Sequence, residues 1–86
     1  MTLKLFQSVA LRCDVANHWL RAGDVACLLD VVPHPSGGEP GYVLEVFNAI
    51  GESIATVTVP ESNVEPLAAD EVFSVRRLES QNVATA

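Results

Sequence analysis

Proline and glycine divide this chain into short segments, and this division limits its fold more than any other feature of the sequence. The clearest case is the stretch 33–40, Pro-His-Pro-Ser-Gly-Gly-Glu-Pro, which contains three prolines and two glycines. Proline lacks a backbone donor, and both residue types favour turns. The stretch therefore predicts a hairpin loop between two strands.

The segments on either side of this loop alternate in the way that strands do. The segment 24–32 is the strongest, and we expect it to be buried over most of its length, with Cys27 as a core thiol. Its predicted buried face carries Val25, Cys27, Leu29 and Val31. The segment 41–47 repeats the period of two, with Tyr42, Leu44 and Val46 on one side.

Three further strands follow from the same reasoning. The segment 53–59 is rich in β-branched residues, which favour a pleated surface, and Pro60 ends it. The segment 6–12 predicts a first strand and 64–67 a short closing strand. The connections between the strands differ in length. Residues 13–24 predict a long irregular loop, and residues 48–52 predict a tight turn with a positive φ at Gly51. Residues 60–63 predict a single 3₁₀ turn.

Five short strands, a long first loop and a turn before the last strand predict a mostly β fold of SH3-like barrel type. A chain of 86 residues has room for one domain. We assign the five-stranded SH3-like barrel to residues 1–67 and a C-terminal extension to residues 68–86. Within the extension, 68–78 is expected to dock in part and the last residues to fray.

A family resemblance is carried by three stretches: 20–32, Leu-Arg-Ala-Gly-Asp-Val-Ala-Cys-Leu-Leu-Asp-Val-Val; 41–48, Gly-Tyr-Val-Leu-Glu-Val-Phe-Asn; and 51–59, Gly-Glu-Ser-Ile-Ala-Thr-Val-Thr-Val. In this order they resemble the short bacterial proteins of domain of unknown function 4926. The resemblance spans about residues 6–67 and implies a small barrel with no established activity. The chain departs from the family pattern at Ala26, where glycine is expected, and in its longer 33–40 loop.

The overall charge constrains the partners. Eleven acidic and five basic residues give a net charge of −6, which repels phosphate backbones and favours a basic protein. We therefore expect no nucleic-acid partner.

No apolar run reaches the length that spans a bilayer, and the first residues lack the apolar core of a signal peptide. These features predict a cytoplasmic protein without a membrane partner. With 49% hydrophobic residues, the small domain also has apolar surface to pair with a second copy.

Aromatic residues are the best indication of a binding surface, because they concentrate energy at interfaces. Trp19 lies in the loop that lines the ligand groove of SH3-like barrels, or else it folds back to cap the barrel. The tail segment 72–78 either packs as a strand on its own domain or adds as a strand to a partner. The candidate binding residues are Trp19, His18, Tyr42, Phe47 and Phe73.

These observations predict a small, acidic, non-catalytic protein-interaction module, such as an accessory, immunity-type or antitoxin-like protein. The alternative is a sensor for a small ligand or peptide, with Trp19, Tyr42 and His18 lining a shallow groove beside the 33–40 loop. An enzyme that uses Cys13 and His18 is the least favoured hypothesis, because no motif activates them. The cysteine and histidine spacing predicts no metal site, and nothing in the sequence calls for a cofactor.

Overall fold

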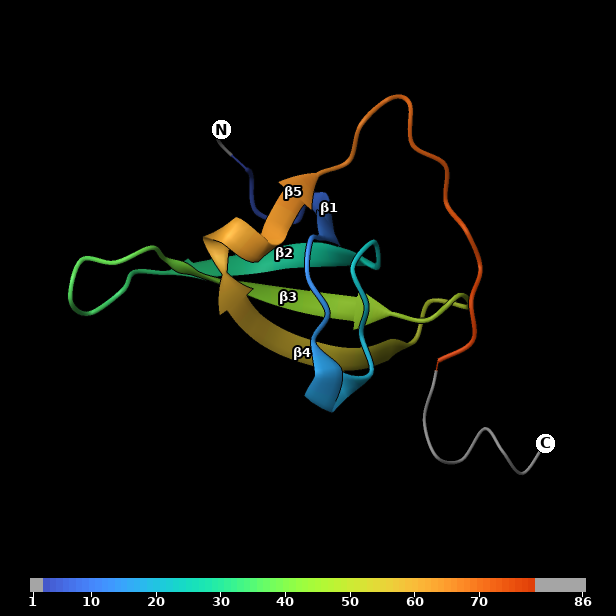
Figure 1. Cartoon of the computed structure of the whole chain (residues 1–86), viewed down its shortest axis with the longest axis horizontal. Coiled ribbons are helices and arrows are strands. Elements are labelled where there is room, and N and C mark those ends of the chain that lie inside the picture. Colours follow the sequence, from blue (N-terminus) through green and yellow to red (C-terminus); the bar gives the residue numbers. More distant parts are fainter. Residues whose placement is uncertain (1–2, 79–86) are drawn as a thin grey trace.

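The computed structural model describes residues 3–78, and it consists of one antiparallel sheet with almost no helix (Figure 1). The five strands are β1 (Ser8–Leu11), β2 (Val25–Val32), β3 (Gly41–Phe47), β4 (Ser53–Pro60) and β5 (Val64–Pro66). Two short 3₁₀ helices interrupt the connections, η1 (Ala16–His18) in the first loop and η2 (Glu61–Asn63) before the last strand. The mostly β fold with a 3₁₀ turn before the last strand is confirmed.

The strands are ordered β4-β3-β2-β1-β5 in the sheet. The long ladders are those of β3 with β2 and of β3 with β4, whereas β1 and β5 share only three residue pairs. The sheet thus begins and ends with the two strands that η2 connects. Closure of this sheet into a complete barrel stays a prediction.

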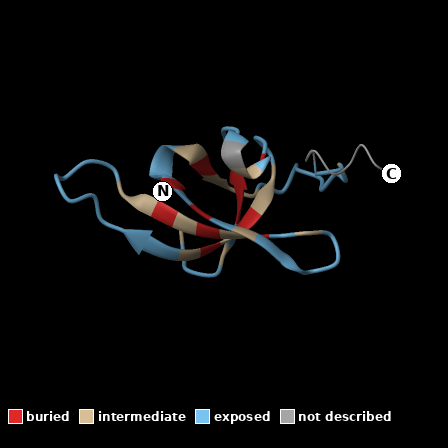
Figure 2. Ribbon diagram, turned by 90° about the horizontal axis from the view of Figure 1, so that it is seen from below, coloured by how far each residue is buried: buried red, intermediate tan, exposed pale blue. Residues whose placement is uncertain are grey.

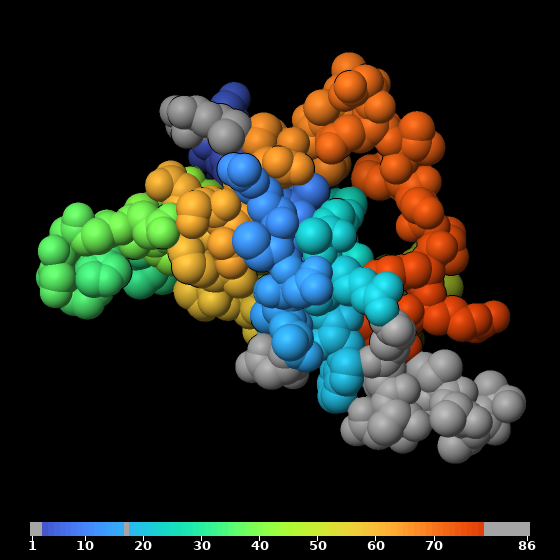
Figure 3. Space-filling model, viewed as in Figure 1, coloured from blue at the N-terminus to red at the C-terminus, as the bar shows by residue number. Residues whose placement is uncertain are grey.

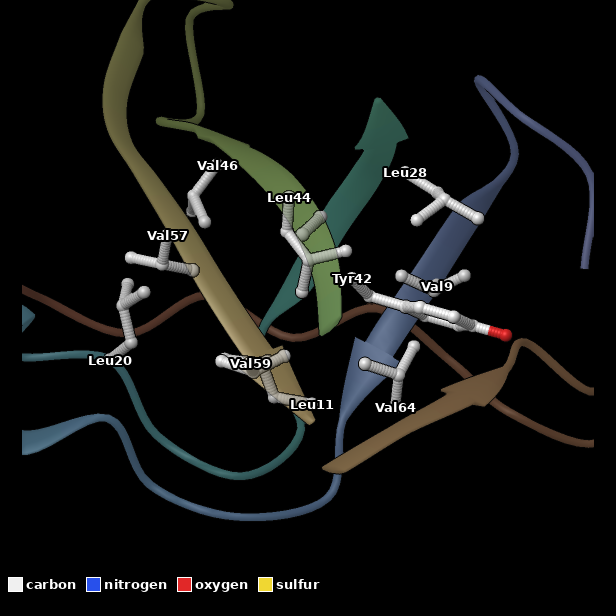
Figure 4. Close-up of a cluster of buried hydrophobic side chains, with 11 residues drawn as sticks. Val9, Leu11, Leu20, Leu28, Tyr42, Leu44, Val46, Val57, Val59 and Val64 are labelled. Atoms are coloured by element: carbon white, nitrogen blue, oxygen red, sulfur yellow. The ribbon is translucent and has the colours of Figure 1, made fainter. Parts of the chain in front are cut away.

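The core lies on the concave side of the sheet and draws side chains from all five strands (Figure 4). Its largest fully buried side chains are Leu11, Leu20, Leu28, Leu44 and Val9. Leu20 comes from the first loop and packs with the strand residues, so the loop contributes to the core. Among the described residues, no polar or charged side chain is buried. Figure 2 shows most of the buried residues in the strands, with the 33–40 loop largely exposed.

The predicted buried face of β2 is wrong. Ala26 and Leu28 are its buried residues, whereas Cys27 is half-buried and the last three residues of the strand are exposed. The pairing of Leu28 with Leu44 explains this result, because opposed residues on neighbouring strands point to the same face. Both faces of β2 carry hydrophobic residues, so alternation alone does not identify the buried one. Tyr42, Leu44 and Val46 share one side of β3, as predicted, and this side is the buried one.

The β3–β4 turn is built around Asn48. Its side-chain Oδ1 accepts hydrogen bonds from the backbone N–H groups of Ile50 at 3.1 Å and Glu52 at 2.9 Å. Gly51 has a φ of 87°, as predicted, a value that side chains with a Cβ rarely adopt. The turn presents Ile50 to solvent, with 80% of its surface exposed.

Replacing Leu44 by alanine should destabilise the protein by about 2 to 5 kcal/mol, because the leucine is fully buried and its removal leaves a cavity. The matched control is Ile50→Ala, which should change the free energy of unfolding by no more than about 0.5 kcal/mol. Urea denaturation of both variants measures the difference. Equal effects would contradict the placement of the core.

Candidate interaction surface

The first loop, residues 12–24, folds back on itself and holds Trp19 at its outer end. Val15 and Leu20 form an isolated antiparallel bridge, and η1 lies between them. Trp19 ends η1 with a φ of 57°, a left-handed conformation that is uncommon for an aromatic residue. Its backbone N–H donates to the carbonyl of Ala16, and 44% of its surface is exposed. The loop therefore presents a half-exposed tryptophan on a fixed backbone.

The C-terminal extension is held against this loop by Arg76. Its Nε donates to Asp24 Oδ1 at 3.0 Å, and its Nη2 pairs with Asp24 Oδ2. The same Nη2 donates to the backbone carbonyl of Trp19 at 3.2 Å. A two-pronged arginine–carboxylate contact is among the strongest polar contacts that a surface offers. We call this contact between Arg76, Asp24 and Trp19 the clamp.

The clamp shifts the titration of its carboxyl group. Partial burial acts to raise the pKa of Asp24, but the hydrogen bonds from Arg76 and from the Arg21 backbone N–H outweigh it, and the pKa lies below its ordinary value of 3.8. The hydrogen bond to Asp24 in turn raises the pKa of Arg76. Both groups are charged near neutral pH, so the contact is a salt bridge there.

The segment 67–78 between β5 and the clamp stands away from the sheet over its middle part, and we call it the arch (Figure 1). It contains no strand or helix, only a turn between Ala68 and Glu71. In this turn the backbone N–H of Glu71 donates to the carbonyl of Ala68, and the backbone N–H of Ala68 donates to Glu71 Oε1. Val72 and Val75 are each 90% exposed and Phe73 is 74% exposed. These three side chains do not pack the segment as a strand on its own sheet. Arg76 provides the contact instead. In Figure 3 the C-terminal part of the arch lies against the first loop.

The structure does not gather the five candidate binding residues into one groove. Tyr42 is buried at the start of β3, and Phe47 is half-exposed at the opposite end of the same strand. His18 is half-buried in η1, and Trp19 follows it. Phe73 lies in the arch, which Arg76 joins to the Trp19 backbone. Trp19 and the arch therefore share one region, and Tyr42 and Phe47 lie elsewhere.

Tyr42 is part of the core rather than of a binding face. Only 6% of its surface is exposed, and its hydroxyl donates to Glu61 Oε2 at 3.1 Å. Burial, together with the hydrogen bond to the Glu61 carboxylate, raises the pKa of Tyr42. The tyrosine thereby ties β3 to η2. Its edge also borders a hollow of about 260 Å³ that Arg12 and Ser62 help to line.

A wider, open groove of about 620 Å³ lies beside the 33–40 loop. It is lined by the loop prolines, by His34 and by the end of β4, and Trp19, Tyr42 and His18 are not among its lining residues. The loop is anchored on η2, because Glu39 accepts hydrogen bonds from the backbone and the hydroxyl of Ser62. A groove thus lies where the sequence predicted one, but other residues form it.

Cys13 and His18, the residues of the least favoured hypothesis, both lie in the first loop, and no hydrogen bond joins them in the described residues. The Oδ1 atom of Asp14 accepts a hydrogen bond from the backbone N–H of Ala22 at 2.9 Å. In residues 3–78, no hydrogen bond joins Asp14 to His18. Cys13 is exposed. In the range 3–78, no group of three histidine, cysteine or acidic side chains is placed to hold a metal ion. No helix in that range is long and apolar enough to cross a membrane.

Sequence reasoning missed the clamp. Asp24 and Arg76 are separated by 52 positions, and neither belongs to a motif. The one available signal was the Arg76-Arg77 pair, a local concentration of positive charge in an acidic chain. No protein-family model, curated protein or solved structure matches the chain. The resemblance to domain of unknown function 4926 therefore stays a prediction.

Replacing Arg76 by glutamine should release the arch, because it removes both prongs of the clamp. We expect limited proteolysis within 67–78 to be several-fold faster and the free energy of unfolding to fall by about 1 kcal/mol. Arg77→Gln removes the same charge from an exposed position outside the clamp and is the control. Equal cleavage rates for the two variants would show that Arg76 does not hold the arch.

The stabilising effect of the clamp should depend on pH. A carboxyl group with a depressed pKa in the folded state stabilises the protein above its unfolded pKa. That contribution is lost as pH falls through the lower folded value. The stability difference between the wild type and Arg76→Gln should be constant near neutral pH and shrink below the ordinary value of 3.8. In an Asp24→Asn background the same difference should show no such change, and a persistent acid dependence there would implicate another group.

Proposed function

We propose that this chain is a protein-interaction module and that the arch is its docking segment. The observation that carries the proposal is the exposure of three large apolar side chains, Val72, Phe73 and Val75, in a segment held at both ends. One end continues from β5 and the other is fixed by the clamp. Apolar side chains at such exposure gain stability when a partner covers them.

A segment that has no regular structure and is held at both ends suits recognition by a partner strand or groove. In an extended chain, Phe73 and Val75 project to one side and Val72 to the other, so a partner meets alternate side chains. Because the ends are already fixed, binding orders fewer residues than binding of a free tail does. The free energy lost to ordering is correspondingly smaller.

The charge of the chain indicates the chemistry of the partner. With a net charge of −6, the module attracts a basic protein over a distance and repels an acidic one. Asp70 and Glu71 are exposed beside the apolar residues of the arch. The partner we propose therefore presents an apolar strip bordered by lysine or arginine.

Capture of partners with tagged protein from the source cells tests this proposal. The variant Phe73→Ser/Val75→Ser removes the apolar side of the arch, and Ile50→Ser removes an equally exposed residue from the β3–β4 turn. We expect a basic protein to be retained by the wild type and by Ile50→Ser. The arch variant should lose it, and the wild type should release it as salt is raised. Retention by the arch variant would contradict the role of the arch, and recovery of no specific protein would contradict the interaction function.

A sensor for a small ligand or peptide is the second candidate, and the open groove beside the 33–40 loop favours it. Its proline-lined wall offers apolar contact, and His34 offers a ring nitrogen. Screening by thermal shift tests this function, because a ligand at 100 times its dissociation constant adds about 2.7 kcal/mol. A ligand whose shift persists in His34→Ala and Pro35→Ser would bind outside this groove.

A further inference from the structure

The outer edge of β4 carries backbone groups that have no partner strand. The backbone N–H of Glu61 donates to the carbonyl of Pro40, which makes this residue pair a hydrogen-bonded pair of the antiparallel ladder. Such pairs alternate along the ladder, so Val59 with Tyr42 and Val57 with Leu44 are the next ones. The N–H and C=O groups of Thr56 and Thr58 therefore point away from β3.

No second strand pairs with these groups in residues 3–78. β4 pairs with β3 alone, and no backbone hydrogen bond involves the outer side of Thr56 or Thr58. Both side chains are exposed. β4 is eight residues long, and its sequence, Ser-Ile-Ala-Thr-Val-Thr-Val-Pro, contains no charged residue. Edge strands that remain unpaired usually carry lysine, an inward charge or a proline near their middle, and β4 has its one proline at the end.

We infer that β4 pairs with β4 of a second copy of this chain, in an antiparallel arrangement with Val57 on the two-fold axis. In this register Thr56 faces Thr58 of the second copy, and each such pair exchanges both N–H···O=C hydrogen bonds. The threonine side chains then meet across the junction, a pairing that stabilises sheets. The two sheets join into one.

The charge pattern of the chain favours a junction through β4. Two molecules with a net charge of −6 repel each other, so a contact between copies must keep carboxylates apart. With Val57 on the axis, the residues that pair across the junction are those of β4 itself, Ser53–Pro60. No acidic residue of β4 therefore meets another across the junction, because the strand contains none. The eight residues of β4 thus form a neutral strip on an acidic protein.

The other free edge of the sheet is a poorer partner for β4. β5 has three residues, its middle residue is Glu65, and its last residue is Pro66, which donates no hydrogen bond. Pairing of β4 with β5 of another copy would also be head-to-tail and would build rings or filaments. A two-fold junction through β4 closes after two copies. The structure therefore predicts a dimer rather than a larger assembly.

Sedimentation of the full chain from micromolar to millimolar concentration tests the inference. We expect a monomer of 9.2 kDa to convert to a species of twice that mass, and the dimer to strengthen as salt is raised because the copies repel each other. This salt dependence is opposite to that expected for a basic partner at the arch, so the two proposals fail separately. A monomer at all concentrations and salts, or a species larger than a dimer, would overturn the inference.

Two variants locate the junction. Thr56→Lys places like charges close together across the axis and should raise the dissociation constant at least about tenfold. Ile50→Lys adds the same charge at an exposed turn outside the edge and should leave the dimer intact. Amide hydrogen exchange gives a second readout that needs no variant. The amides of Thr56 and Thr58 should exchange rapidly in the monomer and become protected in the dimer, and a dimer that leaves both amides unprotected would refute the β4 junction.

Discussion

The ladder formed by the three central strands determines the rest of this structure. Leu28 is opposite Leu44, and Leu44 is opposite Val57, so these residues form one buried row across β2, β3 and β4. A shift of one residue in either pairing would turn the row to solvent. The row therefore sets the register of both hairpins. The positions of the 33–40 loop and of the Asn48 turn follow from it.

The shorter strands complete the core because the central ladder alone leaves it open on one side. Leu11 of β1 and Val64 of β5 are opposite each other and belong to the same buried cluster as Val59 of β4. The core thus includes residues from both edge strands, although no pairing between β4 and β5 is found in residues 3–78. A domain this small buries a limited share of its surface, so each of these contacts is a large fraction of its stability.

Local chemistry made the strands and turns predictable, and long-range contacts limited the prediction of the site. Pro60 and Gly51 end a strand and form a turn for reasons contained in their own backbones, and both were placed correctly. The buried face of β2 was not, because Val25 and Cys27 are as hydrophobic as Ala26 and Leu28 and only the pairing with β3 distinguishes them. The clamp could not be predicted either, because it also depends on contacts between residues far apart in the sequence. An ion pair between Asp24 and Arg76 depends on where a segment without regular structure returns to the sheet.

Asp24 connects the clamp to the core, because its backbone is hydrogen-bonded to a core strand. The backbone carbonyl of Asp24 accepts a hydrogen bond from the N–H of Leu11, which is fully buried, and its N–H donates to the carbonyl of Arg21. The carboxylate that holds Arg76 is therefore fixed by a core strand on one side and by the loop turn on the other. Because Asp24 is held by both of these contacts, the arch is restrained at Arg76 although Val72, Phe73 and Val75 do not pack on the sheet. This arrangement explains how an acidic domain with a small core keeps Val72, Phe73 and Val75 exposed on a segment that is nonetheless held in place.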